Sequence, residues 1–195
     1  MKSAPNLILI GPMGSGKSSI GRRLAQRLGL PFVDVDREIE HATGASIPLI
    51  FELEGEEGFR ERERDVLARV CAGHGQVIAT GGGAVLLPAN RELMPTRGFV
   101  VHLSVTLDNQ LRRLVQDRNR PLLQHPDRRE RLRQLGEQRA PLYAAVADLE
   151  YDTGRSGVRQ AVERLETLLQ QHWQLSAPQP PAPEIPAPAP MDTAP

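Results

Sequence analysis

A glycine-rich segment that ends in a lysine and a serine, Gly11–Ser18, has the residue types and spacing of a phosphate-binding loop, or P-loop. Glycines allow the backbone to curl so that successive N–H groups point at one phosphate group. A helix that starts at the end of the loop would add the positive end of its dipole. In this arrangement Lys17 can bridge the β- and γ-phosphates of a nucleotide, and Ser18 can ligate a magnesium ion. A chance glycine-rich turn is the alternative interpretation.

Two aspartates follow the loop. The segment Phe32–Val35 is typical of a short strand, and Asp34 and Asp36 are two residues apart, so we expect both on one face at its carboxyl end. Parallel α/β sheets bind their ligands at that end of the strands. Two carboxylates there can serve a metal ion and a hydroxyl group. The alternative is that Asp36 caps a helix that continues through Arg37–His41.

Three successive glycines mark a second candidate site segment. Gln76–Ala79 is expected to form the strand beside the P-loop strand, where a typical P-loop NTPase places a metal-binding aspartate. Here Thr80 and Gly81–Gly83 follow instead, and glycines let a ligand approach the backbone closely. Asp34 is the nearest candidate to replace the missing carboxylate. A flexible turn is the weaker alternative.

Arginines are concentrated between Arg112 and Arg139, where there are nine against four acidic residues. Because no aromatic residues are interleaved for base stacking, we favour a mobile lid over about 112–126 that closes on phosphates, rather than nucleic-acid binding. Arg120, directly before a proline, is the best candidate to reach them. Arg60 and Glu63 form an i,i+3 pair in a charged helix, a pattern that by itself predicts solvated surface.

The elements that must position these residues follow one another as in an α/β domain. The apolar run Asn6–Ile10 predicts a buried strand before the P-loop, and apolar residues at helical spacing predict a helix after it that ends at Gly29. Ser46 is the expected cap of a helix over 47–54, and Gly55 separates it from the next. Further elements are expected as strands at 99–103 and 149–151 and as helices over about 56–72 and 157–174.

Composition narrows the class of protein. The formal net charge of the 195 residues is zero, so there is no global attraction to nucleic acid or to an anionic membrane. Cys71 is the only cysteine, which excludes an intrachain disulfide and a cysteine metal cluster, and its helical context predicts a packed residue. Met1–Pro5 is too short and polar for a signal peptide, and no apolar run has the length of a membrane span. We expect a cytoplasmic monomer.

One domain is expected over 1–175, followed by a tail. From Ser176 onward eight of twenty residues are proline, with alanine filling much of the rest. Such a segment cannot pack a core and is expected to be disordered or polyproline-like. We favour an inert extension over a partner-binding role.

Taken together, the motifs resemble the shikimate kinase family from about Leu7 to Leu169. The P-loop alone would not identify this family, but its combination with the other segments does. These segments are Phe32–Asp36, Ile50-Phe51 with Gly55-Glu56, Phe59-Arg60-x-x-Glu63, Val77–Gly83, Arg118–Leu123 and Arg139-x-x-x-Tyr143.

The resemblance implies a three-layer α/β/α P-loop kinase fold with a five-stranded parallel sheet and a mobile lid. It implies ATP-dependent phosphorylation of the shikimate 3-hydroxyl, with Mg²⁺, in the biosynthesis of chorismate and aromatic amino acids. The implied ATP-binding residues are Gly14, Ser15, Gly16, Lys17, Ser18 and Ser19, with Arg120 on the lid and Arg155 or Ser156 near adenine. The implied metal residues are Ser18 and Asp34. The implied shikimate residues are Asp36 for a hydroxyl, Arg60 and Arg139 for the carboxylate, and the backbone of Gly81, Gly82 and Gly83; Lys17, Asp36 and Arg120 are the implied catalytic residues.

The residues themselves agree in kind, because two aspartates and two arginines suit a small hydroxylated carboxylate that accepts a phosphoryl group. A gluconate-type or nucleoside monophosphate kinase is the nearest rival. The Arg60/Arg139 pair disfavours an uncharged acceptor but leaves other carboxylates open. A non-catalytic nucleotide-binding module is the rival of a different class, and intact Lys17, Ser18, Asp34 and Asp36 argue against it.

Overall fold

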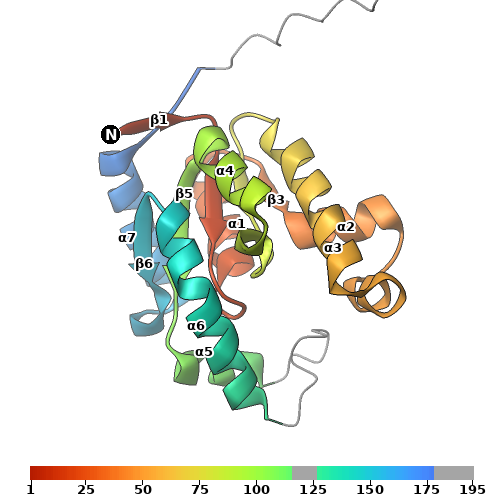
Figure 1. The fold of residues 1–195 in the computed structure, drawn as a ribbon. Helices are drawn as coiled ribbons and strands as arrows, with labels where there is room; N and C mark the ends of the chain where they lie inside the picture. Colours follow the sequence, from red (N-terminus) through yellow and green to blue (C-terminus); the bar gives the residue numbers. More distant parts are fainter. Residues whose placement is uncertain (116–126, 178–195) are drawn as a thin grey trace, which may run out of the picture.

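The computed structural model describes residues 1–115 and 127–177. Its centre is a five-stranded parallel sheet in the order β3-β4-β2-β5-β6 (Figure 1). The strands are β2 (Leu7–Ile10), β3 (Phe32–Asp34), β4 (Val77–Ala79), β5 (Phe99–Ser104) and β6 (Leu149–Asp152). The sheet expected from the sequence is therefore confirmed.

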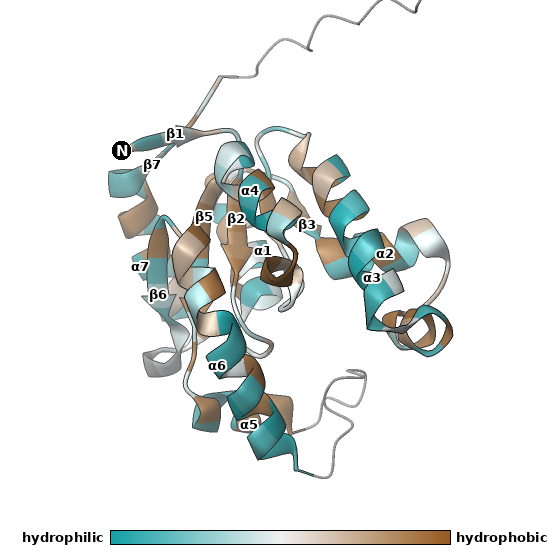
Figure 2. Cartoon of the chain, viewed as in Figure 1, coloured by the Kyte–Doolittle hydropathy of each residue, from teal (hydrophilic) through white to brown (hydrophobic). Residues whose placement is uncertain are grey.

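Helices cover both faces of this sheet, which makes three layers. The alternation along β2 assigns the faces, because Leu7 and Leu9 pack into one hydrophobic cluster and Ile8 and Ile10 into the other. The first cluster joins α1 (Lys17–Leu28) and α7 (Val158–His172). The second joins α2 (Val35–Thr43), α3 (Ile47–Cys71), α4 (Pro88–Arg97) and α6 (Arg128–Val146). Burial on both faces explains why β2 is a continuous apolar run, and the brown strands at the centre of Figure 2 show the same core.

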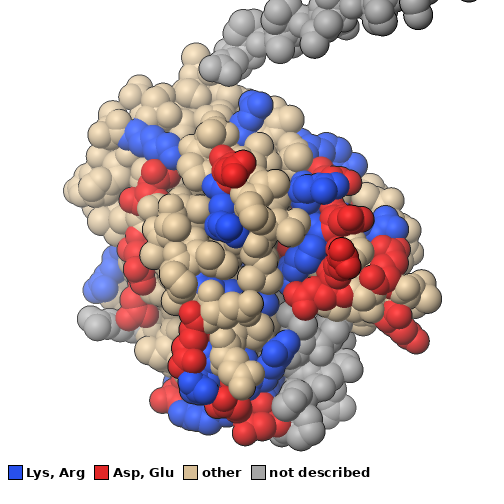
Figure 3. Space-filling model, in the orientation of Figure 1, with Lys and Arg blue, Asp and Glu red and all other residues tan. Residues whose placement is uncertain are grey.

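Charged side chains are interspersed on the surface. On the face drawn in Figure 3, acidic and basic groups alternate over α3 and over α6. Arg133 pairs with Glu130 and Glu137 along α6, and Arg62 pairs with Glu54 across the Gly55 kink of α3. These are exposed pairs, each of which contributes little to stability.

The second strand ends earlier than expected. β3 stops at Asp34, where the pairing with β4 ends, and α2 begins at Val35. Asp34 and Asp36 therefore do not share a strand face, which corrects the sequence-based expectation. Asp36 lies in the first turn of α2, where the helix dipole favours a carboxylate, and Asp34 occupies the N-cap position.

The helical hairpin after α2 forms largely as expected. α3 begins after Ser46 and is interrupted at Gly55, whose φ of 70° and ψ of −172° are not helical. The Ser46 side chain makes no capping hydrogen bond, however. The Glu40 carboxylate of α2 instead accepts from the N–H of the first helical residue, Ile47, at 3.0 Å. The N-terminal end of α3 is thus tied to α2.

A second, two-stranded sheet was missing from the sequence-based description. The final helix ends at His172, not Gln174, and Trp173–Leu175 forms β7, which pairs in parallel with β1 (Lys2–Ala4). The Trp173 indole donates to the Ala4 carbonyl, and the Ser176 N–H also bonds to Ala4. The two ends of the described chain therefore lie side by side (Figure 1). No described helix has the combined length and hydropathy needed to cross a membrane.

Candidate active site

The P-loop connects β2 to α1, and its backbone depends on glycine. Gly11, Gly14 and Gly16 have φ values of 140°, 75° and 97°, which other residues rarely adopt. A Cβ at Gly11 would also collide with the Leu103 carbonyl of β5. The Lys17 ammonium group donates to the carbonyls of Gly11 at 2.7 Å and Pro12 at 2.9 Å, which holds it inside the loop.

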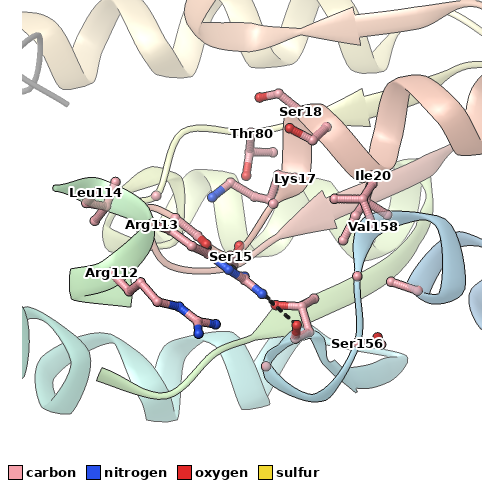
Figure 4. A pocket seen from close by; sticks show the side chains of 18 of the residues that line it. Ser15, Lys17, Ser18, Ile20, Thr80, Arg112, Arg113, Leu114, Ser156 and Val158 are labelled. Atoms are coloured by element: carbon pink, nitrogen blue, oxygen red, sulfur yellow. Dashed lines mark hydrogen bonds between the residues drawn. The ribbon is translucent and has the colours of Figure 1, made fainter. Parts of the chain in front are cut away.

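A cavity of about 800 Å³ opens over this loop; we call it the P-loop cavity. Its floor is the loop and the first turn of α1, and its far wall is the turn between β6 and α7. Figure 4 shows Arg112 and Arg113 reaching from α5 (Leu107–Leu114) toward the side where Ser156 lies. The lining residues that the sequence had nominated are Gly14, Ser15, Gly16, Lys17, Ser18, Ser19, Asp36, Gly82 and Ser156.

Arg113 is a lining residue that the sequence analysis did not single out. Its guanidinium donates to the Gly14 carbonyl at 3.0 Å and to the hydroxyl and carbonyl of Thr153 at 3.0 and 2.7 Å. Burial, helped by the neighbouring Arg112, lowers its pKa. Arg113 thereby ties the P-loop to the β6–α7 turn. In the sequence it was one of nine arginines in a basic segment, and only the register of α5 could have distinguished it.

A second cavity, of about 630 Å³, lies beside the first; we call it the Arg60 cavity. The two cavities share Ser18, Asp36 and Gly82. The further lining residues are Met13, Asp34, Arg37, Glu40, Ser46, Ile47, Pro48, Phe51, Phe59, Arg60, Glu63, Gly81, Gly83 and Arg139. A group bound at the end of one cavity would meet a group in the other at these three shared residues.

Arg60 is buried between two carboxylates of its own helix. Its guanidinium bonds to Glu63 at 2.6 Å and to Glu56 at 2.9 Å. Burial acts to lower the pKa of Arg60, but Glu63 and Glu56 outweigh it, so the pKa is raised. The i,i+3 spacing by itself indicates solvated surface, but Arg60 is 7% exposed and Glu63 is 0% exposed.

Glu63 is the least solvated charged group of the site. Burial raises the pKa of its carboxyl, against the lowering effect of Arg60. Its Oε1 atom has no hydrogen-bond partner among the described residues. Nothing in the i,i+3 spacing distinguishes it from the exposed glutamates beside it, and only its place in the family pattern pointed to the site.

Arg139 reaches the same cavity from α6. Unlike Arg60, it forms no ion pair with a carboxylate of the described residues, and Glu56 acts on it only through space. Arg139 is 3% exposed, and its guanidinium donates to the Gly82 carbonyl at 3.2 Å. Burial is the main cause that lowers the pKa of Arg139, and the nearby Arg60 adds to it. Two arginines from segments far apart in the sequence therefore converge, as the sequence analysis expected.

The three glycines after β4 leave room for side chains of the site itself. A Cβ at Gly81 would collide with the carboxylates of Glu63 and Asp36, and one at Gly83 would collide with the guanidinium of Arg60. Gly82 instead lies against the P-loop backbone. A Cβ added at Gly82 would lie only 3.2 Å from the backbone nitrogen of Met13. The glycine run thus lets the P-loop and the charged groups of α2 and α3 pack around one segment.

Two predicted site residues are not placed. Arg120 lies outside the described residues, as does most of the expected lid, and so does the side chain of Arg155.

Cys71 is buried in the core, where burial raises the pKa of its thiol to about 12. It is a packed residue, as expected.

Comparison with known proteins places this geometry in a family. The shikimate kinase family profile matches residues 13–170. The shikimate kinase of Stenotrophomonas maltophilia strain K279a is 56% identical over 174 residues, covering 89% of this chain and 97% of that protein. The shikimate kinase of Thioalkalivibrio sulfidiphilus is 51% identical over 179 residues, covering 92% and 94%.

A solved structure gives the same result. The shikimate kinase from Acinetobacter baumannii in complex with shikimate is 45% identical, with a TM-score of 0.84, over 86% of this chain and 94% of that one. A sugar kinase from Janibacter, at 20% identity and a TM-score of 0.54, shares the fold alone. The chain belongs to the shikimate kinase family.

Proposed function

We propose that this protein transfers the γ-phosphoryl group of ATP to the 3-hydroxyl of shikimate, giving shikimate 3-phosphate and ADP, in the biosynthesis of chorismate and aromatic amino acids. The observation that carries the proposal is the junction of the two cavities at Ser18, Asp36 and Gly82. A P-loop lines one cavity, and two buried arginines line the other. Donor phosphate and acceptor hydroxyl would meet where the cavities join.

The P-loop cavity is proposed to hold ATP. The backbone of Gly14–Ser19 would bind the phosphates, and the Lys17 ammonium group would exchange its two carbonyl partners for phosphate oxygens. Ser156, with Arg155, is assigned to the adenine end, and Arg113 joins them as a wall of that cavity. Arg120, on a lid over about 112–126, would reach the phosphates on closure.

The Arg60 cavity is proposed to hold shikimate. Arg60 and Arg139 would bind its carboxylate, since both are buried cations that line one cavity. Asp36 would bind the hydroxyl that is phosphorylated, and the backbone of Gly81–Gly83 would lie against the substrate. A carboxylate between two buried arginines makes charge-assisted hydrogen bonds, which are the stronger kind.

Magnesium is proposed to bind between the two substrates. Ser18, Asp34 and Asp36 line one cavity and offer hydroxyl and carboxylate oxygens, the ligands that Mg²⁺ prefers. The described residues contain no cluster of three or more acidic, histidine or cysteine ligands, which suits a cation that keeps most of its water and binds phosphates. When bound, the ion would neutralise charge on the phosphates. Asp34 and Ser18 are its assigned protein contacts.

Catalysis would consist mostly of positioning and charge neutralisation. The acceptor oxygen forms a bond to the γ-phosphorus while the bond to the bridging β,γ-oxygen breaks, and the hydroxyl proton leaves. Asp36, at the junction, would orient the hydroxyl or accept its proton. Lys17 would stay on the phosphates throughout, so its contribution grows as charge moves toward the leaving ADP.

The direct test is ADP release by the purified chain with Mg-ATP and a panel of acceptors: shikimate, gluconate and nucleoside monophosphates. We expect turnover with shikimate and little with the others. Preference for gluconate or a nucleotide would replace the substrate assignment, and no turnover with any acceptor would favour a non-catalytic nucleotide-binding module. The cytoplasmic monomer and the domain limits 1–175 are part of the same proposal; light scattering of the purified protein tests the monomer.

A further inference from the structure

Tyr143 is a buried side chain that the proposed mechanism does not use. It lies one helical turn after Arg139, so both side chains extend from one face of α6. The Tyr143 hydroxyl donates to the Gly82 carbonyl at 2.5 Å, and the Arg139 guanidinium donates to the same carbonyl at 3.2 Å. Gly82 lines both cavities. Tyr143 thus shares a hydrogen-bond acceptor with one of the two buried arginines that line the Arg60 cavity.

The Tyr143 hydroxyl and the Arg139 guanidinium share one acceptor, the Gly82 carbonyl. Burial is the main cause that raises the pKa of Tyr143 to about 12, so the phenol keeps its proton near neutral pH. That single proton goes to the Gly82 carbonyl, which leaves the phenol oxygen as an acceptor. The Arg139 guanidinium, which can only donate, donates to the same carbonyl. Tyr143 and Arg139 therefore meet at one acceptor, and the phenol that fixes the Gly82 carbonyl also fixes the hydrogen-bond partner of Arg139.

Arg139 is held by a neutral acceptor, the Gly82 carbonyl, whereas Arg60 is held by carboxylates. Arg60 is held by two carboxylates, at 2.6 and 2.9 Å. Among the described residues Arg139 has no such ion pair, and its Nε atom has no hydrogen-bond partner. A neutral acceptor can orient this guanidinium without neutralising its charge. The full charge then remains for an anion in the cavity.

The tyrosine ring is itself fixed from the sheet. It stacks on the imidazole of His102 in β5, with ring centroids 4.8 Å apart and planes 18° apart. Burial is the main cause that lowers the pKa of His102, so this neighbour is neutral near pH 7. The hydroxyl of a ring held in this way has little freedom to leave the Gly82 carbonyl.

We propose that Tyr143 is a positioning residue that orients the Arg139 guanidinium toward the carboxylate of the acceptor. The proposal rests on the proposed function, because it assumes that a carboxylate occupies the Arg60 cavity. Tyr143 acts through Arg139 and needs no contact with the substrate. It adds to the site a residue whose effect should fall on acceptor binding alone.

The test is Tyr143→Phe, which keeps the stacked ring and removes the hydroxyl. One neutral hydrogen bond is worth about 1 kcal/mol, so we expect the KM for shikimate to rise about fivefold. The kcat and the KM for ATP should change by less than about twofold. Tyr151→Phe is the matched control, since Tyr151 is the other tyrosine of the chain and its hydroxyl lies 3.4 Å from Ser156 instead. Its KM for shikimate should stay at the wild-type value.

The same substitution in an Arg139→Ala background separates positioning from general loosening. If Tyr143 acts through Arg139, adding Tyr143→Phe to Arg139→Ala should not weaken shikimate binding further. A full fivefold loss in that background, or an unchanged KM in the single variant, overturns the proposal. An inactive wild type would instead count against the proposed function. If Tyr143→Phe does not fold, His102→Leu removes the stacking contact and should also raise the KM for shikimate; an unchanged value there overturns the proposal.

Discussion

The P-loop cavity and the Arg60 cavity are built in different ways. The first depends on backbone, with one contiguous segment curled by three glycines of positive φ around a lysine. The second depends on the buried charges Arg60 and Glu63 of α3 and Arg139 of α6, which surround the glycine run. Backbone groups need only the right local conformation, whereas buried charges need partners from several segments. The two cavities should therefore respond differently to substitution, to pH and to loss of remote parts of the chain.

The largest effect is expected in the P-loop cavity from Lys17→Ala. Loss of a charge that stabilises the transferring phosphoryl group should lower kcat at least about 100- to 1,000-fold. The fold should persist, because the loop conformation depends on its glycines, and the melting temperature should stay within a few degrees. Steady-state kinetics and thermal melts check both parts. If Lys17→Ala unfolds, the contrast between the two cavities is wrong, because the conformation of the P-loop would then depend on a side chain.

The next largest effects are expected in the Arg60 cavity from Arg60→Ala and Arg139→Ala. Charge-assisted hydrogen bonds are worth about 1.5–3 kcal/mol, so each variant should bind shikimate about ten- to a hundredfold more weakly. ATP binding should barely change. The double variant should lose less binding free energy for shikimate than the two single variants lose in sum, since both arginines are assigned to one carboxylate.

Titration calorimetry with shikimate and with an analogue that lacks the carboxylate measures these losses. The analogue should bind wild type poorly and lose little further in the variants. Equal losses for both ligands would show that the arginines shape the cavity without binding the carboxylate.

A smaller, pH-dependent effect is expected from Glu63→Gln. The folded-state pKa of Glu63 is raised above its unfolded value near 4.5. Its contribution to stability is therefore fully present below that pH and is lost as pH rises through the folded pKa. The free energy of unfolding of wild type should fall relative to that of Glu63→Gln as pH increases above 4.5. Urea denaturation at several pH values measures this difference.

Glu56→Gln is the control for Glu63→Gln, since Glu56 is the other, more exposed carboxylate on Arg60. Glu56→Gln removes a charged partner of Arg60 without changing a buried carboxyl group. A pH-dependent change in stability that appears only in Glu63→Gln is therefore due to the burial of Glu63. A constant difference between wild type and Glu63→Gln from pH 5 to 8 would mean that burial does not perturb this group.

The smallest effect is expected from truncation after Ala177. The KM values for shikimate and for ATP should stay unchanged, and the melting temperature should move by less than about two degrees. The described hydrogen bonds of the C-terminal segment end at Ser176, which bonds to Ala4 of β1 and to His74; neither residue lines the P-loop cavity or the Arg60 cavity. Truncation after His172 is the contrasting variant, because it also removes β7 and the Trp173–Ala4 hydrogen bond. It should lower the melting temperature clearly. Equal behaviour of the two truncations would show that β7 does not stabilise the domain.

The same contrast explains what the sequence alone could predict. The P-loop, its flanking strand and helix, and the five strands are local patterns, and the structure has them within one or two residues. The start of α2 at Val35 was missed because a strand pattern and a helix pattern overlap at Asp34–Asp36. The β1/β7 sheet was missed because pairing between the ends of the chain leaves no local signal.

The site residues divide in the same way. Lys17 follows from a motif, but the burial of Glu63 and the convergence of Arg60 with Arg139 arise only when α3 and α6 pack around one cavity. From the residues alone, Arg60 and Glu63 looked like solvated surface. The family resemblance supplied what helical spacing could not.

The β1/β7 sheet has a consequence for the order in which the protein can be completed. β1 is synthesised long before β7, because the Trp173 side chain that bonds to Ala4 follows 169 residues later. Until β7 has been synthesised, the backbone N–H and C=O groups of β1 lack their hydrogen-bond partners in β7. Closing such a long loop costs conformational entropy before the β1–β7 contacts can form, which slows their formation. The entropic cost grows only with the logarithm of the loop length. The parallel sheet around the P-loop can begin to assemble during synthesis, but β1 can pair with β7 only after both have been synthesised.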